Sequence, residues 1–287
     1  MAAPSARPLR LTRRRVLRLA ALAVGTSALR PLVAHAQVAP SWTAIGFSQG
    51  GLPLVIHHLG QGAMRLLLLG DPHGGPEANT TMLTRALLEH FVDHPEDLPP
   101  TLGLDVMPLG NPDGTAAGTR QHLSGVDPNR NWGGSDWQPD AYDSNGRFRR
   151  GLGGPAPFSE QETRALRDWL LGYRPALTVN YHSAGGFLFG PRDGPGGELA
   201  DAYAAASGYI RPTPGGPSPL PYRATGSTNV WLREVGLNGL LIELASPFDP
   251  EFDHNLAAVR ALLTLLGSRP ANGTSGSAVA RSPGPRP

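Results

Sequence analysis

Residues 64–77 read MRLLLLGDPHGGPE, and this stretch decides the fold of the chain. The apolar run from Met64 to Leu69 ends at a glycine, which is typical of a strand buried on both faces of a parallel sheet. The polar loop that follows contains His73 and Glu77. Because ligands bind beyond the carboxyl ends of parallel strands, we expect this loop to lie at a functional site.

The segments around this stretch predict an α/β fold. Residues 42–58 are expected to form a hairpin around Gln49-Gly50-Gly51, and further strands are expected over 104–109, 177–181 and 240–244. Helical spacing of apolar residues predicts a helix over 78–92, whose buried face would carry Met82, Leu83, Ala86, Leu87 and Phe91.

Two more helices and a long irregular stretch complete the expected fold. One of these helices would begin after its cap, Ser159, and run to about Leu171, with Glu162 in the capping-box position. The last helix is expected over 251–266. Residues 110–157 are rich in Gly, Pro, Asn and Asp, and a loop of this length is usually functional. We therefore predict a single α/β domain with a mixed, mostly parallel twisted sheet flanked by helices.

Both ends of the chain differ in composition from its middle. Residues 1–36 hold seven arginines and no acid, with the basic run Thr12 to Arg18, an apolar run over 19–29 and a small-residue site at Ala34-His35-Ala36. This pattern predicts a twin-arginine-type signal peptide over 1–36 and export to the periplasm or the exterior. An uncleaved anchor and a misassigned start site remain alternatives. The catalytic domain is expected over 37–267, and the Gly-, Pro- and Ser-rich residues 268–287 are expected to be a disordered tail.

Composition excludes several classes of function. The 287 residues include no cysteine, so disulfides, thiolate metal sites and a cysteine nucleophile are excluded. All 25 basic residues are arginine, and removing the seven in 1–36 leaves 18 against 23 acidic residues, a formal charge of −5. Nucleic-acid binding needs a surplus of cations, so we expect no nucleic-acid partner. After signal cleavage we expect a monomer without stable membrane insertion.

Three polar groups fall at the carboxyl ends of predicted strands. His73 and Glu77 follow the first strand, His182 follows the strand over 177–181, and Glu243 lies inside the Leu/Ile-rich strand over 240–244. Two histidines and one carboxylate can hold a zinc ion and leave its fourth position open, as in catalytic zinc sites. A lone carboxylate in an apolar strand is costly to bury, so Glu243 is the candidate general base.

Several motifs in this order make the chain resemble the M14 zinc carboxypeptidase family, which includes carboxypeptidase A-like and murein peptide amidase-like enzymes. The resemblance covers most of residues 43–265. Its motifs are LLLLGDPHGGPE, Asn111-Pro112-Asp113-Gly114, the run GVDPNRNW at 125–132, Tyr181-His182-Ser183 and the run YRATG at 222–226. The resemblance implies one zinc ion on His73, Glu77 and His182, with Glu243 as the base that activates water.

The same resemblance implies roles for the neighbouring residues. Asn129 and Arg130 would bind the terminal carboxylate of the substrate, and a planar arginine suits this task because it can bind a carboxylate with two hydrogen bonds. Tyr222 would cover the bound residue, and Arg120 would polarise the scissile carbonyl. Thr228 is the candidate residue for side-chain preference. Arg120 as a surface arginine and Tyr222 as a loop-packing residue remain open alternatives.

The chain departs from the family pattern at two points. The usual spacing is H-x-x-E, whereas one extra residue separates His73 from Glu77, and a bulge allowed by Gly74-Gly75 would absorb it. Pro128 stands where a leucine is common.

We therefore expect a zinc metallocarboxypeptidase that hydrolyses a peptide or amide bond next to a free carboxylate, in peptides or in cell-wall muropeptides. Two alternatives are an aspartoacylase-like amidase or deacylase, and a zinc-less binding module of the cell envelope. The retained Asn129, Arg130 and Tyr222 disfavour the first, and the intact His73, Glu77, His182 and Glu243 disfavour the second.

Overall fold

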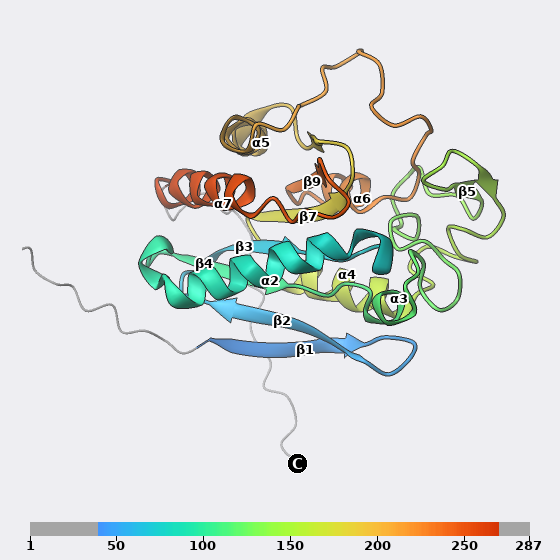
Figure 1. The fold of residues 1–287 in the computed structure, drawn as a ribbon, viewed down its shortest axis with the longest axis horizontal. Helices are drawn as coiled ribbons and strands as arrows, with labels where there is room; N and C mark the ends of the chain where they lie inside the picture. Colours follow the sequence, from blue (N-terminus) through green and yellow to red (C-terminus); the bar gives the residue numbers. More distant parts are fainter. Residues whose placement is uncertain (1–39, 270–287) are drawn as a thin grey trace, which may run out of the picture. The chain divides into compact units, whose positions relative to one another are not determined.

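A seven-stranded mixed sheet forms the centre of the fold in the computed structural model, which describes residues 40–269 (Figure 1). The sheet order is β1-β2-β4-β3-β7-β9-β8. The strands are β1 (Ser41–Phe47), β2 (Pro53–Leu59), β3 (Met64–Leu69), β4 (Leu102–Met107), β7 (Leu177–Ser183), β8 (Phe187–Phe189) and β9 (Gly239–Leu244). A separate small hairpin consists of β5 (Ala141–Tyr142) and β6 (Phe148–Arg149).

The centre of the sheet is parallel and its edges are antiparallel. β4, β3, β7 and β9 run parallel to one another, whereas β2 pairs antiparallel with β4, β1 with β2, and β8 with β9. This confirms the predicted mixed, mostly parallel sheet. The strand predicted over 104–109 begins two residues earlier and ends at Met107, because Pro108 has no N–H to continue the ladder.

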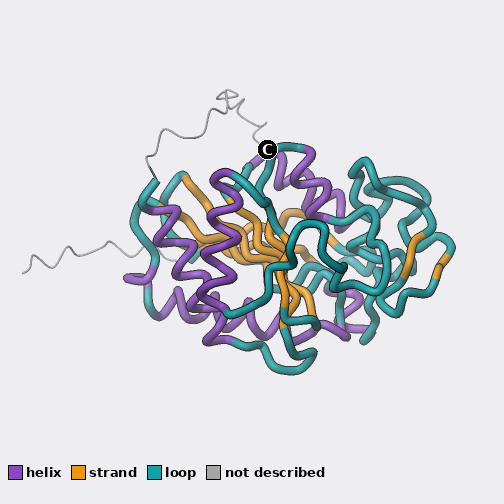
Figure 2. Tube along the Cα trace, turned by 90° about the horizontal axis from the view of Figure 1, so that it is seen from above, coloured by secondary structure: helices purple, strands orange, loops and turns teal. Residues whose placement is uncertain are grey.

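Helices cover both faces of the sheet (Figure 2). They are α2 (Ala78–Asp93), α3 (Pro112–Ala117), α4 (Gln161–Tyr173), α5 (Gly194–Ser207), α6 (Thr228–Glu234) and α7 (Phe252–Gly267), with short 3₁₀ turns η1 (Gly75–Glu77) and η2 (Pro95–Asp97). Leu66 and Leu68 of β3 belong to the core with α2, α5 and α7, and Leu67 and Leu69 to the core with α4 and α6. Alternate residues of one strand thus face opposite layers, which explains the unbroken apolar run.

Helix α2 confirms the predicted helix but not the whole of the predicted buried face, because Met82 is exposed and Ala86 is only partly buried. Leu83, Leu87 and Phe91 are buried, but Met82 is 54% exposed, so its assignment to the buried face was wrong. The buried face is completed instead by small polar residues such as Thr80 and Thr84, whose hydroxyls bond to backbone carbonyls.

The start of α4 also differs from its prediction. The cap residue is Glu160, and no side chain caps the helix. Ser159 accepts a hydrogen bond from Asn131 at 2.9 Å and donates to Glu160 at 2.7 Å, while Glu162 accepts from the backbone N–H of Gln49 at 2.9 Å. Contacts with distant loops therefore replace the local capping box.

Six helices and strands of the described part had no counterpart in the sequence prediction: α5, α6 and β8, together with α3, β5 and β6, which lie inside the stretch 110–157 that was predicted to be irregular. The predicted signal peptide and nearly all of the predicted tail lie outside the described residues, so the domain boundaries stay predictions. Within residues 40–269, no helix combines the length and apolarity needed to cross a membrane.

Substitution of Leu87 tests the assignment of the helix face. Leu87→Ala removes a fully buried side chain between α2 and the sheet, so it should lower the free energy of unfolding by about 2–5 kcal/mol. Met82→Ala, on the same helix, should change it by less than about 0.5 kcal/mol. Urea denaturation of both variants checks this, and equal losses would contradict the assignment.

Candidate active site

Sheet topology brings the sequence-predicted metal ligands together. β3 and β7 pair in parallel with Leu69 opposite Asn180, so the loop after β3 meets the end of β7. His73 lies in that loop, and His182 is the penultimate residue of β7, which extends two residues beyond its predicted end. β9 follows on the other side of β7, with Glu243 opposite His182. Residues far apart in sequence therefore converge at one edge of the sheet.

The turn after His73 accommodates the extra residue in the motif. Gly74 has φ +52°, and a Cβ there would approach the carbonyl oxygen of Thr119 to 2.2 Å. Gly75–Glu77 then form the 3₁₀ turn η1, with Pro76 in its first turn. This turn carries Glu77 back to His73, so the longer spacing still places the two side chains in contact. The glycine is required both for its backbone conformation and for the close approach of α3 and the loop after it.

Three donor atoms converge at the end of β7. His73 Nδ1 lies 2.8 Å from Glu77 Oε1, and His182 Nδ1 lies 3.0 Å from His73 Nδ1 and 3.2 Å from Glu77 Oε2. All three ligand atoms lie within 4.8 Å of one another, and all three residues are buried. Two imidazoles and one carboxylate form the ligand set of a catalytic zinc site. The donor set therefore fits one zinc ion.

Asp127 orients the first of these ligands. Its Oδ1 lies 3.0 Å from Nε2 of His73, and the residue is fully buried. A proton on Nε2, donated to Asp127, leaves the lone pair of Nδ1 free for a metal, an arrangement common around zinc. No role was predicted for Asp127 from the sequence, although this residue stands two positions before Asn129 in the same motif. The acidic residue at this position of the motif was the signal that could have identified this role.

Two of the three ligands, Glu77 and His182, have the ionisation state that binds a metal. Burial alone would raise the pKa of Glu77, but the charges of His73 and Arg120 outweigh it and hold this pKa well below its usual value. Burial lowers the pKa of His182 to about 4, so the imidazole is neutral near pH 7. An ionised carboxylate and a neutral imidazole are the forms that bind a metal.

Glu243 lies beside the ligands in an apolar strand. Burial and, to a smaller extent, the charge of Glu77 raise the pKa of Glu243 to about 8. The side chain of Glu243 is half-buried. Together with Leu241, two residues earlier on β9, it lines a large cavity. A carboxylate with a raised pKa at a cavity wall is suited to accept and return a proton.

Arg120 reaches into the same cluster. Its Nη1 donates to Glu77 Oε1 at 2.5 Å and its Nε donates to Asp127 Oδ2 at 3.0 Å, while Nη2 lies 2.9 Å from Nε2 of His73. Arg120 is therefore not a surface arginine, which was the alternative left open by the sequence. The guanidinium balances two buried carboxylates beside the ligands.

The predicted carboxylate-binding residues line the same cavity. Arg130 is 1% exposed; its Nε donates to Tyr142 O at 3.1 Å and its Nη1 to Asn129 O at 2.8 Å. Its remaining nitrogen, Nη2, finds no hydrogen-bond partner among the described residues. The ring centroid of Tyr222 lies 5.5 Å from the guanidinium carbon of Arg130, so this tyrosine also stands at the cavity.

Thr228 occupies a different place from the one expected. Its backbone N–H and its hydroxyl donate to Asn129 Oδ1 at 2.9 Å and 3.2 Å, and its side chain faces a small separate cavity that includes Trp132. Asn229, the next residue, lines the large cavity instead. Thr228 thus holds Asn129 in place and does not border the substrate space.

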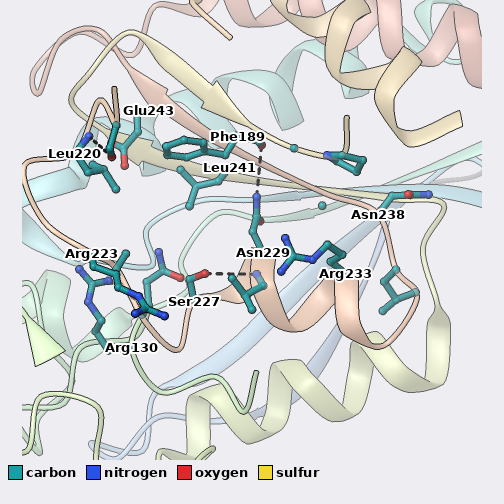
Figure 3. Close-up of a pocket in the computed structure, with 18 of the residues that line it drawn as sticks. Arg130, Phe189, Leu220, Arg223, Ser227, Asn229, Arg233, Asn238, Leu241 and Glu243 are labelled. Atoms are coloured by element: carbon teal, nitrogen blue, oxygen red, sulfur yellow. Dashed lines mark hydrogen bonds between the residues drawn. The ribbon is translucent and has the colours of Figure 1, made fainter. Parts of the chain in front are cut away.

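The large cavity has a volume of about 840 Å³ (Figure 3). His73, Arg120, Arg130 and Glu243 lie on its wall, together with parts of β8, α6 and β9. This volume lies within the range of cavities that hold small organic ligands. The metal site thus opens onto a space that can hold the end of a peptide.

Substitution of Asp127 tests its orienting role. Asp127→Asn keeps the shape but removes the charge that holds the proton on Nε2 of His73, so zinc affinity should fall roughly 10- to 100-fold. Chelator competition measures this. Asp168→Asn, on the exposed part of α4, is the control and should leave affinity unchanged. Unchanged affinity in Asp127→Asn would contradict the role.

Comparison with known proteins agrees with this geometry. The zinc carboxypeptidase family model, Peptidase M14, matches residues 75–211, a segment that includes Glu77 and His182. Murein peptide amidase A from Escherichia coli strain K12 is 29% identical over 189 residues, which cover 62% of this chain and 69% of the relative.

Solved structures share the fold. The crystal structure of murein-tripeptide amidase MpaA from Escherichia coli O157 matches with a TM-score of 0.60 and 24% identity, covering 85% of this chain and 98% of that one. Carboxypeptidase A from Helicoverpa armigera matches with a TM-score of 0.64 and 18% identity, covering 80% and 69%. Together with the convergent His73, Glu77 and His182, the family match identifies a zinc carboxypeptidase domain of the M14 type over residues 75–211 of this chain.

Proposed function

We propose that this chain is an exported zinc metallocarboxypeptidase that hydrolyses a peptide or amide bond next to a free carboxylate, with murein-derived peptides as its substrates. One observation carries the carboxylate specificity. Arg130 is almost fully buried, yet its Nη2 has no partner within residues 40–269 and the residue lines the cavity beside the metal ligands. A buried guanidinium nitrogen without a partner is costly unless a ligand supplies the acceptor, and a carboxylate is the natural one.

The choice of substrate class rests on similarity. Murein peptide amidase A, by its name, acts on murein peptides, and it aligns with 62% of this chain. The predicted signal peptide over 1–36, which would deliver the enzyme to the compartment of the cell wall, supports the same choice. Export itself is proposed from the sequence pattern, because those residues lie outside the described part of the chain.

Each residue at the site can be given a task. Arg130 and Asn129 would bind the terminal carboxylate and fix the last residue of the substrate in the cavity. A bound zinc ion would supply a Lewis acid that polarises the scissile carbonyl and the attacking water. Glu243 would take the proton of the attacking water and pass it to the leaving amine, a transfer that its raised pKa suits.

Two further residues would assist these steps. Arg120, held by Glu77 and Asp127, would stabilise negative charge on the carbonyl oxygen as the bond is attacked. Tyr222 would cover the bound residue and exclude water from the cavity. Its loop, residues 211–225, contains no helix or strand.

The aspartoacylase-like alternative and the zinc-less binding module find less support. The first finds no support in the matches described above, which are to carboxypeptidases and a murein peptide amidase. The second does not account for three buried donors that converge on one point, because burying such groups without a ligand is unfavourable.

Substitution of the base separates catalysis from metal binding. Glu243→Gln should retain one zinc ion per chain but hydrolyse roughly 100- to 10,000-fold more slowly, because proton transfer is lost. His182→Ala should lose both zinc and activity. Zinc content by metal analysis, together with hydrolysis of C-terminally varied peptides and muropeptides with and without chelator, measures these outcomes.

A matched control is Glu89→Gln, which lies on the exposed side of α2 and should behave as the unsubstituted enzyme. Wild-type rates in Glu243→Gln would exclude it as the base. Hydrolysis that persists in the chelated enzyme would exclude the proposed zinc-dependent reaction.

A further inference from the structure

The lining of the large cavity is strongly positive. It includes five arginines and only two acids, Asp193 and Glu243. The proposed reaction uses Arg120, Arg130 and Glu243. The arginines that remain are Arg192, Arg223 and Arg233, and the reaction assigns no task to any of them.

Arg233 is distinguished by its position. Asn229 and Arg233 are separated by one helical turn of α6, and both line the cavity. Figure 3 shows Arg233 and Asn238 on the opposite side of Asn229 from Glu243, Arg130 and Arg223. The cavity thus runs from the reacting end, past Asn229, to a guanidinium held on a helix. A side chain on the last substrate residue would extend along this direction.

No neighbouring carboxylate among the described residues holds the guanidinium of Arg233. It makes no ion pair within the described part of the chain. The adjacent acid, Glu234, accepts from the backbone N–H of Ser135 at 2.8 Å and from its hydroxyl at 2.5 Å. Asp193 caps α5 by position and makes no ion pair with Arg233. Both guanidinium edges therefore remain available to a ligand.

The wall between the two ends suits a side chain with an apolar stem. Phe189 and Leu241 line the cavity beside Asn229. The amide nitrogen of Asn229 donates to Phe189 O at 3.4 Å, so it does not compete with Arg233 for an anion. Its Oδ1 is an acceptor and would repel a carboxylate, so an anionic group has to reach past Asn229 to bind Arg233.

We propose that Arg233 selects substrates whose C-terminal residue has a side chain ending in a carboxylate. This inference rests on the proposed function, since it places the α-carboxylate of that residue at Arg130. Two arginines would then bind the two carboxylates of one substrate residue. This would select both the orientation of that residue and the length of its side chain. An arginine can form paired hydrogen bonds with a carboxylate, so the preference over an uncharged isostere is large.

The first arm of the test compares hydrolysis of N-acylated dipeptides that end in Glu, Gln, Leu or Lys by the zinc-loaded enzyme. We expect kcat/KM for Glu to exceed that for Gln by at least about tenfold, as expected for a charge-assisted pair. Arg233→Gln should abolish the difference and leave the Leu peptide unaffected. Arg233→Glu should favour Lys over Glu. Comparing kcat/KM for peptides that end in Asp, 2-aminoadipate or 2-aminopimelate shows which side-chain length best spans the distance from Arg130 to Arg233.

Arg85→Gln is the matched control, because Arg85 is also an exposed helical arginine but lies on α2, away from the cavity. It should preserve the preference. Equal rates for Glu and Gln in the wild-type enzyme, or a preference that survives Arg233→Gln, would overturn the inference while leaving the proposed hydrolysis intact.

A second arm measures binding without turnover. Calorimetry on the zinc-loaded protein should show N-acetylglutamate binding at least about tenfold more tightly than N-acetylglutamine, with the difference lost in Arg233→Gln. If this preference is found but no peptide is hydrolysed, the proposed function fails and the role of Arg233 stands. If neither ligand is preferred, the role of Arg233 fails whether or not peptides are hydrolysed.

Discussion

The structure depends on a cluster of buried charges at the carboxyl ends of β3 and β7. Glu77 and Asp127 are both buried and ionised, the charges of Arg120 and His73 balance them, and the neutral His182 lies within hydrogen-bonding distance of Glu77. Buried ions are tolerated only when they are paired and hydrogen-bonded. Each group in the cluster therefore constrains the conformation of the other groups and of the loops that carry them. The turn at Gly74, the 3₁₀ turn η1 and the segment around Asp127 all serve to close this cluster.

The substrate space is organised by the same loops. Asp127 accepts from the backbone N–H of Asn129 at 2.8 Å, so the residue that orients His73 also fixes the segment leading to Arg130. Thr228, at the start of α6, holds the side chain of Asn129 from the other direction. The metal ligands and the carboxylate-binding residues are thus joined by one hydrogen-bond network. α6 then carries the cavity wall from Asn229 to Arg233.

Much of the fold was predictable because its signals are local. The apolar run of β3 faces a helical layer on each side, and this explains why its composition identified a buried parallel strand. His73, His182 and Glu243 were found because they stand at strand ends or inside an apolar strand. The remaining elements were missed for a physical reason. α5 begins with Gly194-Pro195-Gly196-Gly197, and α6 has only seven residues, so neither has a clear helical pattern.

The errors at single residues have a common cause, which is that tertiary contacts decided the outcome. Ser159 bonds to Asn131 and leaves α4 without a side-chain cap, and Thr228 turns away from the cavity to bind Asn129. Asp127 was overlooked because its role depends on His73, which is distant in sequence. No local pattern contains these contacts. The motif identified the segment, but only the three-dimensional arrangement distinguishes the residues that border the cavity from those that support it.

The central claim is that His73, Glu77 and His182 bind one zinc ion. Anomalous diffraction at the zinc edge from crystals of the zinc-loaded protein tests it most directly. The account predicts one peak, about 2.0–2.2 Å from Nδ1 of His73, Nδ1 of His182 and a carboxylate oxygen of Glu77. A peak bound by other residues, or a zinc site from which Glu77 is turned away, would contradict it.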